Sequence, residues 1–131
     1  MPDTPESTRR APWVQGAAPG AEGWLSLSDD DLLYRIAALP PGHEMDEQLL
    51  DVVRSHRHFF IRQEAAKRVG DSERLKAWSS DRHVGQVLVR GMRRAEDVDY
   101  LERLRDETRH LEVRKAAEAQ LDIIQASRER S

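Results

Sequence analysis

The histidines that stand beside charged residues are the side chains of this chain whose types and spacing could do chemistry. His43-Glu44 places an imidazole next to a carboxylate, and His56 and His58 could chelate a metal ion if the chain between them were extended. An oxygen-activating di-iron site, however, needs several imidazole and carboxylate ligands that converge. The single His43-Glu44 pair lies in a loop with Pro40, Pro41 and Gly42. We therefore expect no metal site and no cofactor.

An arginine-histidine pair recurs along the chain, as Arg57-His58, Arg82-His83 and Arg109-His110. Each pair precedes a segment with helical spacing of apolar residues. Equivalent loops of a repeat protein lie one repeat apart, so these histidines are not expected to meet at one metal ion. We expect them to cap helices or to stack between neighbouring repeats. The chain has no cysteine, no phosphate-binding loop and no catalytic-triad motif, so we expect no catalytic residues and no enzymatic activity.

Two segments of different composition organise the 131 residues. Residues 1–27 are rich in proline and glycine and predict a flexible arm, in which Trp13 and Trp24 are expected to dock, either on the domain itself or on a partner. Residues 28–127 predict the folded domain. Its first helix is expected to begin at a Ser28 cap with three aspartates in the first turn and to end before Pro40.

From residue 46 onward the sequence repeats with a period of about 26 residues. Aligned apolar or small residues form five columns: Leu49/Leu75/Leu101, Val52/Trp78/Leu104, Ile61/Val87/Val113, Ala65/Gly91/Ala117 and Val69/Ala95/Leu121. One continuous helix would turn its apolar stripe about 80° out of phase in each period, and a coiled coil needs a multiple of seven. The pattern therefore predicts a helical hairpin repeated about three times.

Each predicted hairpin contains a first helix, called A, and a second helix, called B. We expect the A helices near 46–55, 72–79 and 97–106, and the B helices near 59–69, 83–94 and 111–125. Helices of about ten residues are marginal alone, so each hairpin must pack on its neighbours. The prediction is an all-α fold, a short α-solenoid of about three hairpins preceded by one helix and the arm.

Two of the B segments carry a shared motif. Ile61-Arg62-Gln63-Glu64-Ala65-Ala66-Lys67-Arg68-Val69 and Val113-Arg114-Lys115-Ala116-Ala117-Glu118-Ala119-Gln120-Leu121 resemble the Val-Arg-x-x-Ala-x-x-x-Leu second helix of HEAT-like repeats. The middle unit departs from the motif, with Leu88 in the arginine column. The resemblance covers residues 46–125. It implies an α-solenoid whose B helices line the concave face and whose column arginines, Arg62 and Arg114, pair with acids of neighbouring repeats.

Some HEAT-like proteins are enzymes, and the residues of this chain can be compared with those of two such enzymes. Deoxyhypusine hydroxylases of this kind bind two irons with repeated His-Glu pairs, whereas this chain has one such pair. Bilin lyases also form solenoids, but no residue here indicates chromophore chemistry. The resemblance therefore favours a binding protein over a catalyst.

Charge is segregated between the two kinds of helix, although the whole chain is only slightly acidic, at −3. Segment 82–94 carries +4, whereas segment 96–107 carries −4. With the B helices on the concave face, as the resemblance implies, the positive charge lines a groove for an acidic ligand. A helical wheel places these candidate partner-binding residues outside the buried stripe: Lys67, Arg68, Arg90, Arg93, Arg94 and Lys115. The expected apolar anchors are Phe59, Phe60, Val89 and Trp13.

The sequence thus predicts a cytoplasmic, non-catalytic adaptor or scaffold that binds an acidic protein segment on the basic face. Two alternatives stay open. Nucleic-acid backbone could bind in the same groove, or a basic partner could meet the acidic outer face of Asp97, Asp99, Glu102, Asp106 and Glu107. No apolar run approaches the length of a membrane span, so we expect no membrane partner.

Overall fold

Every regular element in residues 21–130, the part of the chain that this computed structural model describes, is a helix. The elements are α1 (Ala21–Leu25), α2 (Asp29–Ala37), α3 (Asp46–Val53), α4 (Phe59–Arg68), the 3-10 helix η2 (Ser72–Trp78), α5 (Arg82–Arg90), the 3-10 turn η3 (Ala95–Asp97), α6 (Val98–Glu107) and α7 (Leu111–Arg130). The all-α prediction is therefore confirmed. Each of the six predicted A and B segments contains a helix, but the second A segment is a 3-10 helix and the second B helix ends at Arg90 rather than at residue 94.

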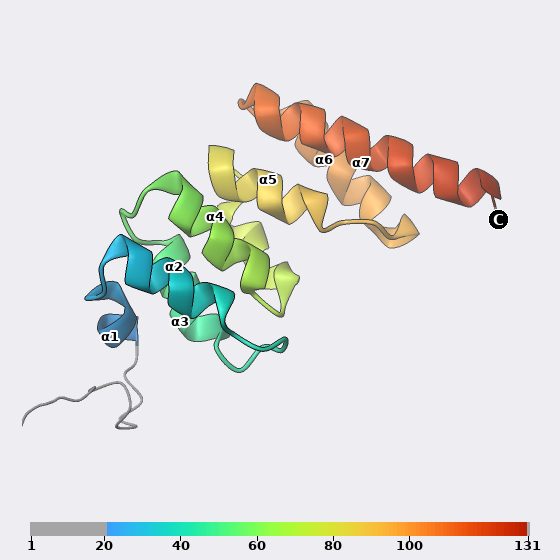
Figure 1. The fold of residues 1–131 in the computed structure, drawn as a ribbon. Coiled ribbons are helices and arrows are strands. Elements are labelled where there is room, and N and C mark those ends of the chain that lie inside the picture. The colour runs from blue at the N-terminus through green and yellow to red at the C-terminus, as the bar shows by residue number, and fades with distance from the viewer. Residues whose placement is uncertain (1–20, 131) are drawn as a thin grey trace, which may run out of the picture.

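The helices pack as hairpins in two layers (Figure 1). Within the hairpins α3 packs on α4, η2 on α5, and α6 on α7. Across the hairpins α2 packs on α4, α4 on α5, and α5 on α7. We call α2, α4, α5 and α7 the B layer, and α1, α3, η2 and α6 the A layer. Between the layers lies the apolar core, in which Leu32, Val52, Val84, Leu101 and Val113 are fully buried.

The segment before α2 is anchored to the domain, although it was expected to belong to the arm. Trp24 in α1 is 1% exposed and belongs to the core. Arg57 holds this segment in place, because its guanidinium donates to the carbonyl oxygens of Leu25 at 2.6 Å and Leu27 at 2.7 Å. Of the two tryptophans predicted to dock, Trp24 therefore packs on its own domain. Trp13 lies outside the described residues.

Local capping explains where α2 begins and ends. The Ser28 hydroxyl accepts a hydrogen bond from the Asp31 amide at 3.2 Å, and three aspartates occupy the first turn, where the helix dipole favours negative charge. The last helical residue is Ala37, shortly before Pro40. The predicted start and stop of this helix are confirmed.

The middle hairpin departs from the 26-residue register. His58 caps α4, so the period places the next cap at residue 84, but Asp81 caps α5 three residues earlier. Counted from the caps, Gly85 rather than Leu88 occupies the arginine column, which corrects the alignment. Space at Gly85 is tight, because an added Cβ would lie 3.2 Å from Val113 and 3.3 Å from the carbonyl oxygen of Ser79.

Arg62 and Asp81 join three helices. The Arg62 guanidinium donates to Asp81 Oδ2 at 2.7 Å and to the carbonyl oxygen of Val53 at 2.6 Å, at the end of α3. The other Asp81 oxygen accepts the amides of His83 and Val84, both at 2.9 Å. Burial raises the pKa of the Asp81 carboxyl, but these hydrogen bonds outweigh burial and hold its pKa below the ordinary value of 3.8. The predicted pairing of Arg62 with an acid of the next hairpin is confirmed.

Arg114 does not make the equivalent ion pair. Its guanidinium approaches the carbonyl oxygen of Thr108 at 3.4 Å, in the turn before its own helix. The prediction that Arg114 pairs with an acid of a neighbouring repeat is therefore wrong. Arg62 pairs with the cap of the hairpin that follows it, whereas α7 is the last helix in residues 21–130, so the structure describes no following cap for Arg114.

Candidate functional site

A hollow of about 550 Å³ lies between α5 and α7 on the B layer. Its positive lining residues are Arg90, Arg93 and Lys115, and Glu112 is the one acid among the described residues that line it. The remaining lining residues are polar or small: Gln86, Ala116, Ala119 and Gln120. We call Arg90, Arg93 and Lys115 the hollow cations. The structure thus brings together three of the six predicted partner-binding residues.

The hollow cations are weakly engaged within the protein. Arg90 donates to the neutral Gln86 Oε1 at 3.0 Å. Within residues 21–130, Arg93 and Lys115 form no hydrogen bond and no ion pair. The acid of the hollow, Glu112, faces Arg82 at 3.8 Å, near the limit of an ion pair, and both side chains are about half exposed. Most of the positive charge of the hollow is therefore not neutralised within residues 21–130.

The other three predicted cations serve the fold or pair locally. Arg68 donates to the carbonyl oxygens of Ala37, the last residue of α2, and of Leu39. Lys67 pairs with Glu64 at 2.8 Å on the same helix. Neither Arg68 nor Lys67 lines the hollow, and Arg94 does not line it either.

The prediction placed Arg93 and Arg94 on a helix, but in the structure they follow the end of α5. The helix α5 ends at Arg90 and is followed by Gly91, so the helical wheel does not apply to the two residues. Arg94 turns toward acids of its own loop, with Asp97 at 3.6 Å and Glu96 at 3.8 Å. Arg93 instead lines the hollow.

The predicted apolar anchors differ in accessibility. Val89 is wholly buried in the core, so it is not available to a partner and the prediction is wrong at this position. The prediction placed Val89 on the exposed face because the 26-residue alignment sets α5 three residues out of register. Phe59 and Phe60 are 44% and 48% exposed. Phe59 stacks on His83 of the next hairpin at 4.3 Å between ring centroids, whereas Phe60 has no ring partner within the described residues.

The recurring histidines act as predicted, by capping and stacking between hairpins. His58 Nδ1 accepts the Phe60 amide at 3.2 Å and caps α4. His83 stacks on Phe59 across the α4–α5 boundary. His110 lies 3.0 Å from the carbonyl oxygen of Ser80 in the preceding hairpin. The contacts of His83 and His110 bind one hairpin to the next.

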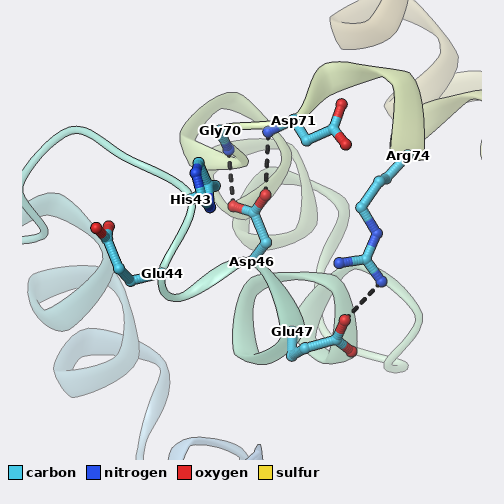
Figure 2. A pocket seen from close by; sticks show the side chains of 7 residues that line it. All are labelled: His43, Glu44, Asp46, Glu47, Gly70, Asp71 and Arg74. Carbon is cyan, nitrogen blue, oxygen red and sulfur yellow. Dashed lines mark hydrogen bonds and ion pairs between the residues drawn. The ribbon is translucent and has the colours of Figure 1, made fainter.

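The His43-Glu44 pair borders a second hollow, of about 520 Å³, beside α3 and η2 (Figure 2). There the Asp46 carboxylate is occupied by the amides of Gly70 at 2.7 Å and Asp71 at 3.0 Å. Figure 2 shows the Glu44 carboxylate turned away from Asp46 and from the imidazole of His43. Within residues 21–130, no group of three metal-ligating side chains converges.

One member of the predicted acidic outer face is not on the surface. Asp97 is 6% exposed, and its carboxylate accepts the backbone amide of Arg94 at 3.1 Å. Asp97 therefore stabilises the turn that begins α6 and does not belong to the acidic outer face. Asp99, Glu102, Asp106 and Glu107 are exposed.

Sequence analysis missed the glutamines of the hollow. Gln86 and Arg90 are four residues apart on α5, a spacing that predicts their contact once the helix is known. Gln120 is 6% exposed and donates to the carbonyl oxygen of Met92 at 2.8 Å, which fixes the loop that carries Arg93. No sequence signal marks Gln120 as buried, because the 26-residue period aligns it with the charged residues Arg68 and Arg94.

No family model, curated protein or solved structure matches this chain. In the part of the chain that the structure describes, none of the helices is long and apolar enough to cross a membrane.

Proposed function

We propose that this protein is an adaptor that binds an acidic protein segment at the hollow between α5 and α7. The observation that carries the proposal is the set of hollow cations, three positive side chains in one concave site with a single acid. Two of them, Arg93 and Lys115, have no polar partner within residues 21–130. Carboxylates of a partner would supply the missing counter-charge.

The proposal includes the HEAT-like solenoid as the scaffold. Its support is the order of packing, in which each hairpin contacts the next through the B layer, together with the Val-Arg-x-x-Ala motif in α4 and α7. In such a scaffold the hollow would lie along the concave face, and the Arg62–Asp81 contact would hold successive hairpins in register. The cytoplasm is the proposed location, and the role requires no metal or cofactor.

Binding of a fluorescein-labelled glutamate-rich peptide, followed by fluorescence anisotropy, tests the proposal. The double variant Arg90→Glu/Arg93→Glu is expected to weaken binding at least tenfold. The matched control, Arg103→Glu/Arg109→Glu, makes the same change of charge at exposed residues outside the hollow and is expected to keep most of the affinity. Equal losses in both variants would mean that the overall charge, not the hollow, attracts the peptide.

Nucleic acid is the alternative ligand, because phosphates would meet the same cations. A duplex DNA competitor in the same assay separates the two. Phosphate contacts release counterions, so DNA affinity would fall steeply and linearly with the logarithm of salt concentration. We expect the glutamate-rich peptide to be displaced poorly by DNA at about 0.15 M salt, since three cations are few for a duplex. Tight, salt-dependent DNA binding would replace the adaptor proposal.

A further inference from the structure

We propose that the adaptor site recognises an extended peptide in which an apolar side chain lies about three residues from a pair of acidic side chains. The apolar side chain would contact the Phe59–His83 stack, and the acids would bind the hollow cations. This inference rests on the proposed function and adds to it the sequence pattern of the partner.

The Phe59–His83 stack is an ordered aromatic surface that solvent still reaches. The Phe59 ring lies 4.3 Å from the imidazole of His83 and 4.5 Å from that of His58, measured between ring centroids. The amide of Gln63 donates to the carbonyl oxygen of His83 at 2.9 Å, which ties α4 to the start of α5. Even so, Phe59 is 44% exposed. An aromatic ring held in place before binding loses little conformational entropy when a partner covers it.

The stack and the hollow lie along one face of α5. His83 and Arg90 are seven residues apart, which at 100° per residue leaves them about 20° apart around the helix axis. Gln86 lies between them and lines the hollow. The Arg90 guanidinium reaches back to Gln86, so its charge points along this face toward the stack. A ligand lying along α5 would meet both features.

The distance along α5 fixes the spacing in the ligand. Seven residues of α-helix span about 10 Å, at about 1.5 Å per residue. An extended peptide advances about 3.3 Å per residue, so about three peptide residues cover the same length. Charge complementarity then places the acidic pair at Arg90, Arg93 and Lys115.

Labelled peptides of glycine and serine provide the test. The probe carries one leucine and, three residues away, two glutamates, and is made in both chain directions. The comparison peptides replace the leucine by glycine, move it next to the glutamates, or replace the glutamates by glutamine. In the chain direction that binds better, the probe is expected to bind the full-length protein about tenfold more tightly than the leucine-free or the shifted peptide. Equal affinity of the probe, the leucine-free and the shifted peptides would overturn the inference.

A pair of phenylalanine variants locates the apolar contact. Phe59→Ala is expected to lower probe affinity about tenfold and to leave the affinity of the leucine-free peptide unchanged. Phe60→Ala removes a ring of similar exposure that has no ring partner in residues 21–130 and is expected to change neither affinity. Equal effects of the two substitutions on the probe would contradict the assignment. Circular dichroism of both variants checks that the helices are intact.

The same data separate this inference from the proposed function. If the glutamine peptide binds as well as the probe, or if Arg90→Glu/Arg93→Glu has no effect, then the adaptor proposal itself fails. If binding needs the glutamates and the hollow cations but ignores the leucine and Phe59, then the adaptor proposal stands and this inference fails.

Discussion

Two groups of basic residues differ in the contacts that their side chains make. Arg57, Arg62 and Arg68 are bound to backbone carbonyls of other elements, and the first two also pair with aspartates. Arg93 and Lys115 of the hollow have no polar partner within residues 21–130, and Arg90 contacts only a neutral amide there.

The difference shows that charge alone does not mark a binding surface. An arginine whose guanidinium already binds carbonyl oxygens has less to offer a partner, because a partner would have to displace those hydrogen bonds. An exposed cation without a counter-charge has no such cost. We therefore expect substitutions in the first group to change the free energy of unfolding and substitutions in the second to change binding.

The largest effect on stability is expected from Asp81→Ala. The substitution removes the cap of α5 and leaves Arg62 without its carboxylate, where the two side chains are only 16% and 23% exposed. We expect the free energy of unfolding to fall by about 2–3 kcal/mol, measured by urea denaturation. Asp81→Asn keeps an oxygen that can accept the capping amides and should lose less. If Asp81→Ala and Asp81→Asn lower the free energy of unfolding equally, then the whole effect comes from the ion pair with Arg62.

The Asp81 contacts also predict a pH dependence. Because the pKa of Asp81 lies below 3.8 in the folded protein, its ionised form stabilises the fold fully above the unfolded-state pKa. That contribution is lost as the pH falls through the folded-state pKa. The difference in unfolding free energy between the wild type and Asp81→Asn should therefore be constant from pH 7 to pH 5 and shrink below pH 4. A difference that grows in acid would contradict this account.

Arg68→Ala separates the two groups most clearly, because Arg68 was predicted to bind the partner. It holds the carbonyl oxygens of Ala37 and Leu39, so its loss should lower the free energy of unfolding by about 1 kcal/mol. The affinity for the glutamate-rich peptide should not change. Arg90→Ala should show the opposite behaviour, with weaker peptide binding and unchanged stability. A loss of peptide affinity in Arg68→Ala would extend the site to α4.

The smallest expected effect is that of Gly85→Ala. Alanine would favour the helix by roughly 1 kcal/mol, but its Cβ would lie 3.3 Å from the backbone oxygen of Ser79 and 3.2 Å from Val113. Since a backbone atom cannot easily give way, we expect a net loss of about 0.5 kcal/mol or less, measured by thermal denaturation. Clear stabilisation would show that α5 and α7 can separate at this point.

Much of the fold could be predicted from the sequence, because apolar spacing and turn residues mark the hairpins. The order of helices and the Ser28 cap followed from those signals, whereas the contact of Arg62 with the next hairpin followed from the resemblance to HEAT-like repeats. The register of the middle hairpin could not be predicted, because its own cap, Asp81, shifts it by three residues while apolar residues still fill most columns. That shift led to the errors at Leu88 and Val89.

The candidate site was predictable only in part. Exposure of Lys115 and the flanking position of Arg90 followed from helical geometry, but the engagement of Arg68 and Arg94 depends on carbonyls and carboxylates that tertiary packing brings near. The burial of Asp97 likewise depends on a turn that periodicity does not describe. Sequence patterns identify which residues are charged, whereas the choice between holding the fold and binding a partner requires the contacts.

The most direct test of the central claim is an NMR titration of the ¹⁵N-labelled protein with the glutamate-rich peptide. We predict that the largest amide shifts lie at Arg90, Arg93 and Lys115, and that those of Arg62 and of helix α6 stay near zero. Shifts centred on Arg62 or spread evenly over all exposed cations would contradict the claim that the hollow between α5 and α7 is the binding site.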